Sequence, residues 1–434
     1  MFPGPEESAV CVDHVCEAAV PFGGVCTRNE VCESGLCLDS GRCSKPCAGA
    51  ADCPPAPEWT CASVANYPHD MCQCVPGGPE VCDGSDNDCS GDVDDGATCS
   101  EVGFTCQSGA CACDPAGLCN GVCKDLASDV QNCGACGATC AVGAACFEGH
   151  CQTTLVTGQD VSDMAVDATH VYWTNDAPST GGNNTVMKVS VDGGALTTLA
   201  SGQIHPRNVV LDATHVYWTN NVPSDGAGTV MKVPLGGGAS TTLAAGQESL
   251  FGLAVNATSV FWSYRGFPNS VRQMPLGGGA FVSSDMDQDG PQNMAADATG
   301  VYVVADGGMV IWVPLGGGVP TKLAPTDYSK SSRTHSIALD ATHVYWTNDD
   351  TVMKLPLGGG ATITLATGQV PGSLAVDGVN VYWVNSELAG SVRKMPVGGG
   401  AVTTLASAKF AGALALDATS VYWSTGDAIM KAPK

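Results

Sequence analysis

The sequence predicts an all-β protein in which small disulfide-rich modules over residues 1–151 precede a seven-bladed β-propeller over residues 152–434. Three observations support this prediction. All 24 cysteines lie between Cys11 and Cys151. A unit of about 40 residues recurs seven times in the remainder, which is the period of a propeller blade. The last unit of residues 152–434 lacks a fourth strand, and the region begins with a strand of that type.

Cysteine fills about one position in six of residues 1–151, well above the roughly 8–10% that marks a disulfide scaffold. This density is typical of an oxidising compartment, so we expect an extracellular or cell-surface protein with up to twelve disulfides and no free thiol. The first residues lack a charged and apolar leader, and we interpret the leader as removed before residue 1.

One cysteine spacing recurs in the form C-x(5 or 6)-C-x-x-G-x-C. The three triplets are Cys26, Cys32 and Cys37; Cys99, Cys106 and Cys111; and Cys140, Cys146 and Cys151. The glycine permits a tight turn between the second and third cysteines, so each triplet predicts a small hairpin stapled to its neighbourhood. The spacing leaves the pairing of the cysteines open.

Cys133 and Cys136 have the CxxC spacing of some redox and zinc sites. A thioredoxin-like site needs a βαβ context, and a zinc ribbon needs a second such pair at suitable spacing. The sequence has neither around these residues, so we expect a structural disulfide for this pair.

The strongest chemical motif is VCDGSDNDCSGDVDDG at residues 81–96. Alternate residues of a tight loop turn their oxygens toward one centre, and Gly91 takes the sharp bend of a D-x-D-x-[DNS]-G calcium loop. Position 12 falls on Ala97 instead of a bidentate Glu, which predicts a modest affinity for Ca²⁺. The candidate metal ligands are Asp86, Asp88, Ser90, Asp92 and Asp94.

The motif resembles the CDGxDNDCDGxVDEG repeat of secreted bacterial metal-binding proteins, a family that includes a surface copper protein of methane oxidisers. Ser90 stands where that family has Asp. The resemblance implies a bound metal, and Ca²⁺ suits the oxygen ligands better than copper, which prefers imidazole or thioether; an acidic turn without an ion is the alternative. DLASDVQNCGACGATC at 125–140 also resembles bacterial surface proteins, which implies a secreted, lipoprotein-like location.

The repeat is marked by an aromatic strand. Its seven copies are Val171-Tyr172-Trp173, Val216-Tyr217-Trp218, Val260-Phe261-Trp262, Val301-Tyr302-Val303, Val344-Tyr345-Trp346, Val381-Tyr382-Trp383 and Val421-Tyr422-Trp423. A short apolar strand ending in Asp or Asn precedes each copy, and this side chain can bond its own backbone two residues on, which predicts a hairpin. A third strand of the VMKV type and a fourth of the TTLA type complete a four-stranded blade.

The two ends of the repeat region complete each other. The last unit stops after its third strand, whereas Thr153-Thr154-Leu155-Val156 is a fourth strand with no unit ahead of it. We therefore predict that this strand closes the last blade. The recurring Trp predicts inter-blade packing, with local repacking in the fourth unit, where Val303 replaces Trp and Trp312 is gained.

The units resemble the YWTD-type propellers of lipoprotein-receptor ectodomains, with YWTN in three copies where that family has YWTD. That family usually has six blades, so a count of seven departs from it. Propellers of the NHL-like and streptogramin-lyase-like types are the alternatives.

The charge distribution excludes two classes of partner. Residues 1–151 carry 22 acidic and four basic residues, and the whole chain has a formal charge of −25. Nucleic acid and anionic lipid repel such a chain, so we expect no nucleic-acid partner. No apolar run reaches the roughly 18 residues of a spanning helix, and we expect a monomer without a membrane span.

Three long connections on one face of the propeller carry the candidate binding residues. They lie at 201–208, 283–293 and 325–336, and a fourth contribution comes from Arg265 between a second and a third strand. The candidate ligand-binding residues are His205, Arg207, Arg265, Tyr328, Arg333 and His335. Ordinary solvated loops are the alternative. Asp285, Asp287 and Asp289 also alternate as calcium ligands do.

Two functions remain open. The first is a binding and structural protein, in which a metal-binding disulfide stalk displays a propeller that binds a protein or carbohydrate at the cell surface. The second is a propeller enzyme, a lyase or hydrolase, with His205 or His335 as the base. The sequence singles out no catalytic triad and no paired carboxylates, so we expect no catalytic residues and no enzymatic activity.

We predict that Asp88→Ala weakens calcium binding by the intact protein, because it removes a carboxylate ligand from the centre of the 81–96 motif. Isothermal titration with Ca²⁺ measures the effect, and Asp114→Ala, outside the motif, is the control. Equal binding by wild type and Asp88→Ala would show that this motif holds no calcium.

Overall fold

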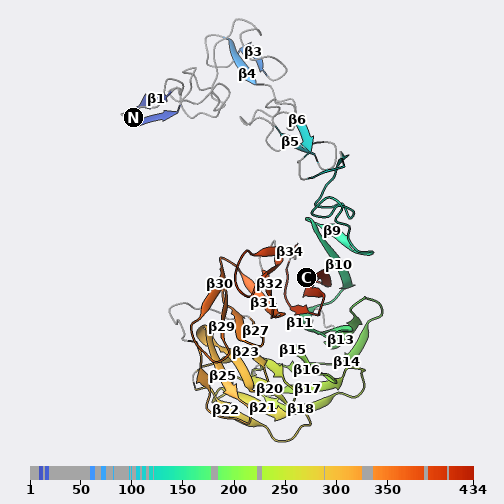
Figure 1. Cartoon of the computed structure of the whole chain (residues 1–434), viewed down its shortest axis with the longest axis vertical. Helices are drawn as coiled ribbons and strands as arrows, with labels where there is room; N and C mark the ends of the chain where they lie inside the picture. The colour runs from blue at the N-terminus through green and yellow to red at the C-terminus, as the bar shows by residue number, and fades with distance from the viewer. Residues whose placement is uncertain are drawn as a thin grey trace. The chain divides into compact units, whose positions relative to one another are not determined.

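A computed structural model describes the protein (Figure 1). The residues described are 9–12, 15–18, 59–63, 70–74, 82, 97, 99, 104–107, 110–113, and 117–434 apart from 121, 177–183, 222–226, 288, 325–335, 386–389 and 408–409. The chain divides into two compact units, Met1–Ala138 and Thr139–Lys434.

The described residues of the first unit form four separate two-stranded antiparallel sheets. They pair β1 (Ala9–Val12) with β2 (Val15–Ala18), β3 (Trp59–Ser63) with β4 (Asp70–Cys74), β5 (Phe104–Gln107) with β6 (Ala110–Cys113), and β7 (Leu118–Cys119) with β8 (Val122–Cys123). The expectation of a disulfide-rich region built from small hairpins is confirmed over the described residues.

Disulfides account for every cysteine side chain that the structure describes. These disulfides include Cys82–Cys106, Cys99–Cys111, Cys113–Cys123, Cys119–Cys136 and Cys140–Cys151. The expected disulfide within the CxxC pair is wrong, because Cys136 bonds Cys119 of the β7–β8 hairpin; Cys133 is also in a disulfide. The sulfurs that cluster at Cys82, Cys99 and Cys111 are bonded as well, so they offer no thiolate to a metal.

Two of the cysteine triplets share one connectivity that the spacing left open. In each, the second and third cysteines face one another across a hairpin, and the disulfide joins the first to the third, as in Cys99–Cys111 and Cys140–Cys151. In the last triplet the turn residues Glu148 and Gly149 have φ of 48° and 78°. Two positive φ values in a two-residue loop match the twist of a hairpin, which explains the glycine of the motif.

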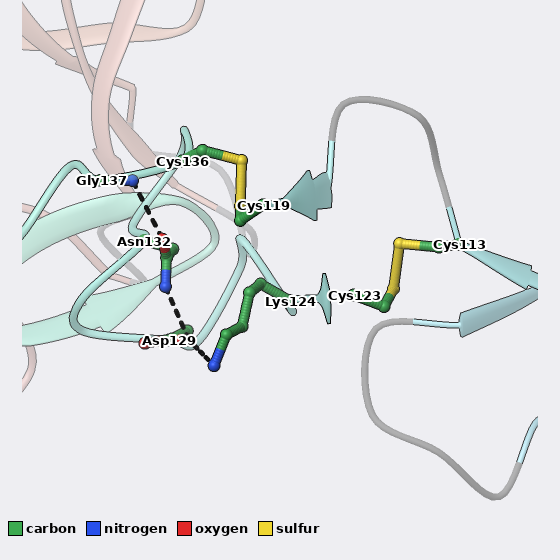
Figure 2. The surroundings of a disulfide bond; sticks show 8 residues. All are labelled: Cys113, Cys119, Cys123, Lys124, Asp129, Asn132, Cys136 and Gly137. Carbon is green, nitrogen blue, oxygen red and sulfur yellow. Dashed lines mark hydrogen bonds and ion pairs between the residues drawn. A yellow bond between two sulfur atoms is a disulfide. The ribbon is translucent and has the colours of Figure 1, made fainter. Parts of the chain in front are cut away.

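The segment 125–137 folds on its own polar side chains (Figure 2). Asp129 accepts hydrogen bonds from the Gln131 N–H (2.8 Å) and the Asn132 amide (3.0 Å), which lower the pKa of its carboxyl. Lys124 lies 3.6 Å from the same carboxylate, and the Gly137 N–H donates to Asn132 (2.9 Å). The DLASDVQNCGAC motif is therefore a self-contained loop fastened by Cys119–Cys136.

The second unit contains the seven blades. Blade 1 is β11 (Val161–Val166), β12 (His170–Asn175), β13 (Thr185–Ser190) and β14 (Thr197–Ala200). Blade 2 is β15 (Pro206–Leu211), β16 (His215–Asn220), β17 (Gly228–Pro234) and β18 (Thr241–Gln247). Blade 3 is β19 (Leu253–Val255), β20 (Ser259–Tyr264), β21 (Ser270–Pro275) and β22 (Val282–Asp285).

The remaining blades follow the same antiparallel order. Blade 4 is β23 (Pro291–Ala296), β24 (Gly300–Ala305), the 3₁₀ turn η4 (Asp306–Gly308), β25 (Met309–Pro314) and β26 (Thr321–Lys322). Blade 5 is β27 (Ile337–Leu339), β28 (His343–Thr347), β29 (Thr351–Pro356) and β30 (Ile363–Thr367). Blade 6 is β31 (Pro371–Val376), β32 (Asn380–Asn385), β33 (Ser391–Pro396) and β34 (Thr403–Ser407).

Blade 7 is completed from the other end of the unit. Its sheet runs β35 (Leu414–Leu416), β36 (Ser420–Ser424), β37 (Ala428–Pro433), β10 (His150–Thr157) and β9 (Ala145–Phe147). Thr153 faces Lys431 and Val156 faces Ile429, and Figure 1 shows β10 beside the C-terminus. The predicted closure, with three C-terminal strands and one N-terminal strand, is confirmed, and so is the count of seven.

The core lies between neighbouring blades. The tyrosine of one blade packs with the tryptophan of the next, as Tyr172 does with Trp218 and Tyr422 does with Trp173, and these rings are almost fully buried. The inter-blade role of the tryptophans is confirmed. In blade 4, Met286, Met294 and Met309 fill the space beside Val303. Trp312 packs instead with the cluster between blades 4 and 5.

Two repeated polar contacts fasten the blades. The aspartate after the first strand accepts backbone N–H bonds from its own turn and a tyrosine hydroxyl from the second strand, for example Tyr217 to Asp212 at 2.7 Å. A lysine of the third strand donates to a carbonyl of the next blade. These bonds are Lys188 to Leu235 (2.6 Å), Lys232 to Leu276 (2.7 Å), Lys354 to Val397 (2.6 Å) and Lys431 to Val191 (2.9 Å). The last of them joins blade 7 to blade 1.

No helix among the described residues has the length and apolar character needed to cross a membrane.

We predict that Val156→Ala destabilises the whole propeller by about 2 kcal/mol, because it opens a cavity in the closing strand, where Val156 is buried. Chemical unfolding of the intact chain measures the change, and the exposed Val402→Ala is the matched control. An unchanged unfolding free energy, with loss of signal at the N-terminal strand alone, would mean that β10 frays without opening the ring.

Candidate functional site

A cavity of about 470 Å³ opens at one end of the propeller axis. The first strands of the seven blades contact one another in a ring, and the residues at or just before their N-terminal ends line the cavity. The connections that enter these strands, and those between second and third strands, lie at the same end. We call this end the channel mouth.

A ring of seven residues, five of them polar, surrounds the channel mouth at one repeat position. Its members, in blade order, are Asp163, Asn208, Gly252, Asn293, Ser336, Ser373 and Ala413. Three of their side chains accept a backbone N–H from the first strand of the next blade. The bonds run from Val209 to Asp163 (2.9 Å), from Leu374 to Ser336 (3.1 Å) and from Leu414 to Ser373 (3.2 Å). The ring therefore sets the spacing of the blades around the cavity.

Asp163 is the titratable member of this ring, and its environment shifts its protonation. Burial raises the pKa of its carboxyl to about 7, although hydrogen bonds from the Met164 and Val209 N–H groups act in the opposite direction. Asp163 thus changes charge close to neutral pH, inside the cavity.

Two of the predicted binding residues meet a buried acid that the sequence reading missed. His205 Nδ1 lies 3.0 Å and Arg207 Nη2 lies 3.4 Å from the two oxygens of Asp176, whose side chain is nearly buried. Asp176 follows the second strand of blade 1, whereas His205 and Arg207 lie at the start of blade 2. The contact holds the Arg207 side chain, which is half exposed, at the rim of the cavity.

The third described candidate, Arg265, forms a similar pair across blades 3 and 4. Its guanidinium binds Asp306, which also accepts a hydrogen bond from Gln292 (2.7 Å). The guanidinium carbon lies 5.0 Å from the centre of the Phe251 ring, a cation–π distance. Phe251 and Arg207 line the cavity, and Arg265 borders it through its contact with the Phe251 ring.

A repeated Gly-Gln pair anchors the loops at this end, and the sequence reading missed it. Gly158, Gly202, Gly246 and Gly368 all have positive φ, and each precedes a glutamine. In three blades the glutamine accepts the tryptophan indole N–H, with Trp173 to Gln159 at 3.2 Å, Trp218 to Gln203 at 2.9 Å and Trp262 to Gln247 at 2.9 Å. Blade 7 is preceded by Ser-Ala-Lys, and there Trp423 Nε1 has no partner among the described residues. In the sequence, the recurrence of Gly-Gln after the TTLA-type strand was the signal that could have pointed to this glutamine.

The three aspartates at 285–289 differ in their surroundings. Asp289 is buried and lies 2.8 Å from Lys322, whereas Asp285 and Asp287 are exposed. Across the described part of the chain, the groups of three or more ligand atoms within 4.8 Å of one another consist of cysteines. All three aspartates line one pocket, and their binding of calcium stays a prediction.

The other predicted residues lie outside the described part of the chain. These are the metal ligands Asp86, Asp88, Ser90, Asp92 and Asp94, and the loop residues Tyr328, Arg333 and His335. Their roles stay predictions.

No family model matches the chain, and no curated protein matches it. Among solved structures, it is similar to the extracellular domain of a hybrid two-component system from B. thetaiotaomicron, with a TM-score of 0.50 and 11% identity over 65% of this chain and 40% of that one. The β-propeller domain of the Trilobed protease from Pyrococcus furiosus gives a TM-score of 0.49 at 9% identity, over 64% of this chain and 96% of that one. A chain of a nidogen/laminin complex gives 0.38 at 16% identity, over 49% and 85%. At 11% identity, the first likeness shows the propeller fold alone.

We predict that Asp163→Asn flattens the pH dependence of stability. The folded state holds a proton on Asp163 that the unfolded chain releases at lower pH. The corresponding stabilisation is therefore present in acid and is lost as the pH rises through about 7. Between pH 5 and pH 8 the free energy of unfolding of the wild type should fall by about 2–4 kcal/mol more than that of the variant.

Urea unfolding at both pH values tests this prediction, with Asp160→Asn as a control at an exposed carboxylate. Parallel pH profiles for the wild type and Asp163→Asn would contradict it.

Proposed function

We propose that the protein is a secreted or cell-surface binding protein, in which the channel mouth recognises a ligand and no covalent chemistry follows. The observation that supports this most is the composition of the rim over blades 1–3. Arg207 and Arg265 lie there on buried or half-buried acids, and Phe251 contacts Arg265. Arginine and aromatic side chains held in place by neighbours are typical of the residues that dominate protein interfaces.

Exposed apolar side chains on the same loops favour a protein over a carbohydrate as the ligand. Ile204, Phe251 and Phe267 are 55%, 44% and 96% exposed, and each lies in a connection at the channel-mouth end of blades 1–3. We call these three residues, with Arg207 and Arg265, the rim patch. Burial of its apolar surface supplies affinity, while the two guanidinium groups supply directional contacts. A carbohydrate ligand is the second candidate.

The contacts at the cavity also support binding over catalysis. Asp163 is the carboxylate with a pKa near 7; one of its oxygens accepts the N–H of Met164 in its own strand, and the other accepts the N–H of Val209 and so joins blade 1 to blade 2. His205, the described candidate base, is paired with Asp176. A lyase or hydrolase at the channel mouth is the alternative function, and the His205–Asp176 pair is the observation in its favour.

The disulfide-rich unit supports the proposed location and architecture. All of its described cysteine side chains are in disulfides, as expected in an oxidising compartment. We further propose that Asp86, Asp88, Ser90, Asp92 and Asp94 bind Ca²⁺ in this stalk, and that the YWTN strands place the propeller with YWTD- or NHL-like propellers.

We predict that an Arg207→Ala, Arg265→Ala double variant loses at least about tenfold in affinity for any ligand found with the wild type, since truncating such anchors typically costs about 2 kcal/mol. Protein and glycan arrays probed with the intact chain identify the ligands, and Lys322→Ala, an exposed cation elsewhere on the propeller, is the control. Product analysis accompanies each hit. Full binding by the double variant would place the site elsewhere, and turnover of a hit would favour the enzyme.

A further inference from the structure

A second groove, of about 630 Å³, lies where the ring closes, within Thr139–Lys434. The β9–β10 hairpin contributes Phe147, Glu148 and Gln152 to it, and blade 7 contributes Asp427 and Met430. Of the residues that the structure describes, none lines both this groove and the channel mouth. The groove therefore spans the N-terminal strand and the C-terminal blade that this strand completes.

Two aromatic side chains of the groove remain exposed after folding. Phe147 is 50% and Phe410 is 56% exposed, and both line the groove. The Phe410 ring lies against Gly426, where an added Cβ would be 4.0 Å from the ring. Paired exposed aromatic rings in a concave site are typical of a surface that another molecule covers.

The groove also contains an unused buried acceptor. Gln152 is 8% exposed, and its Oε1 atom has no hydrogen-bond partner among the described residues. An unsatisfied buried carbonyl destabilises the folded state, whereas a ligand that brings an N–H donor to it gains a desolvated hydrogen bond.

The charge of the groove determines which sign of charge is favoured in a ligand. Among the described residues that line the groove, the charged ones are Glu148 and Asp427, and both are acidic. Glu148 accepts a hydrogen bond from the Ser407 hydroxyl, which holds its carboxylate at the groove. A ligand with a positive charge next to its apolar part is therefore favoured.

We propose that this groove binds a peptide segment of a partner protein in which a tryptophan is flanked by lysine or arginine. The indole ring is an apolar surface that carries one N–H donor, so it can contact Phe147 and Phe410 and donate to Gln152. The flanking cations pair with Glu148 and Asp427. Because the ligand would contact both the N-terminal strand and blade 7, it binds the closed ring and stabilises it.

The experiment titrates the intact chain with three capped tripeptides, Lys-Trp-Lys, Lys-Phe-Lys and Glu-Trp-Glu, by isothermal calorimetry. We expect Lys-Trp-Lys to bind about tenfold more tightly than Lys-Phe-Lys, which lacks the indole donor, and more tightly than Glu-Trp-Glu. We also expect Lys-Trp-Lys to raise the melting temperature of the propeller.

Three variants assign the contacts. Gln152→Leu should bind the Trp and Phe tripeptides equally, Asp427→Asn should reduce the preference for lysine over glutamate, and Phe410→Ala should weaken all binding. Phe281→Ala, which changes an exposed phenylalanine elsewhere, should bind as the wild type does. Asp427 and Phe410 are exposed, so their variants keep the test valid if Gln152→Leu does not fold.

Equal affinity of the wild type for the Trp and Phe tripeptides would overturn the proposal. So would an unchanged Trp preference in Gln152→Leu, or binding of an oligosaccharide but of no tripeptide. Failure of the channel-mouth proposal leaves this result unaffected, because the rim-patch variants do not touch the groove.

Discussion

Closure of the ring by β10 is the interaction on which the rest of the propeller depends. A blade buries its two faces against its neighbours, so a ring left open at one point exposes an apolar face on each side of the gap. Pairing of β10 with β37 completes blade 7, Trp173 packs with Tyr422 across the junction, and Lys431 donates to Val191. These contacts join residues from opposite ends of the unit, so the channel mouth exists only when both ends are in place.

The same strand links the propeller to the disulfide chemistry of the chain. Cys151 lies in β10 and bonds Cys140, so the hairpin that carries Phe147 and Glu148 is fixed directly to the closing strand. The second groove, where the ring closes, follows from this arrangement, because the hairpin supplies one wall and blade 7 supplies the other. A ligand bound in the groove would therefore stabilise the closed ring by mass action. Neither ligand binding there nor closure of the ring involves the rim patch.

Repetition separates structural positions from those open to function. The Asp and Tyr of the first hairpin, the inter-blade lysine and the Gly-Gln pair recur because each blade must meet its neighbour in the same way. The position after the second strand carries no such constraint, and it is Asp176, Asn221, Arg265 and Asp306 in the first four blades. Ion pairs between neighbouring blades form there, between Asp176 and Arg207 and between Arg265 and Asp306.

The sequence by itself determined the blade count, the closing strand, the buried tryptophans and the disulfide-rich region. The first three follow from a pattern that recurs along residues 152–434, and the last follows from the density of cysteine in residues 1–151. It also placed His205, Arg207 and Arg265 at one end of the propeller, since loop position follows from strand order. The tertiary structure alone decided their partners Asp176 and Asp306, the Cys119–Cys136 pairing, the pairing of Asp289 with Lys322, and the groove at Gln152. These depend on which side chains of different blades or hairpins come within a few ångströms, and spacing along one chain does not encode that distance.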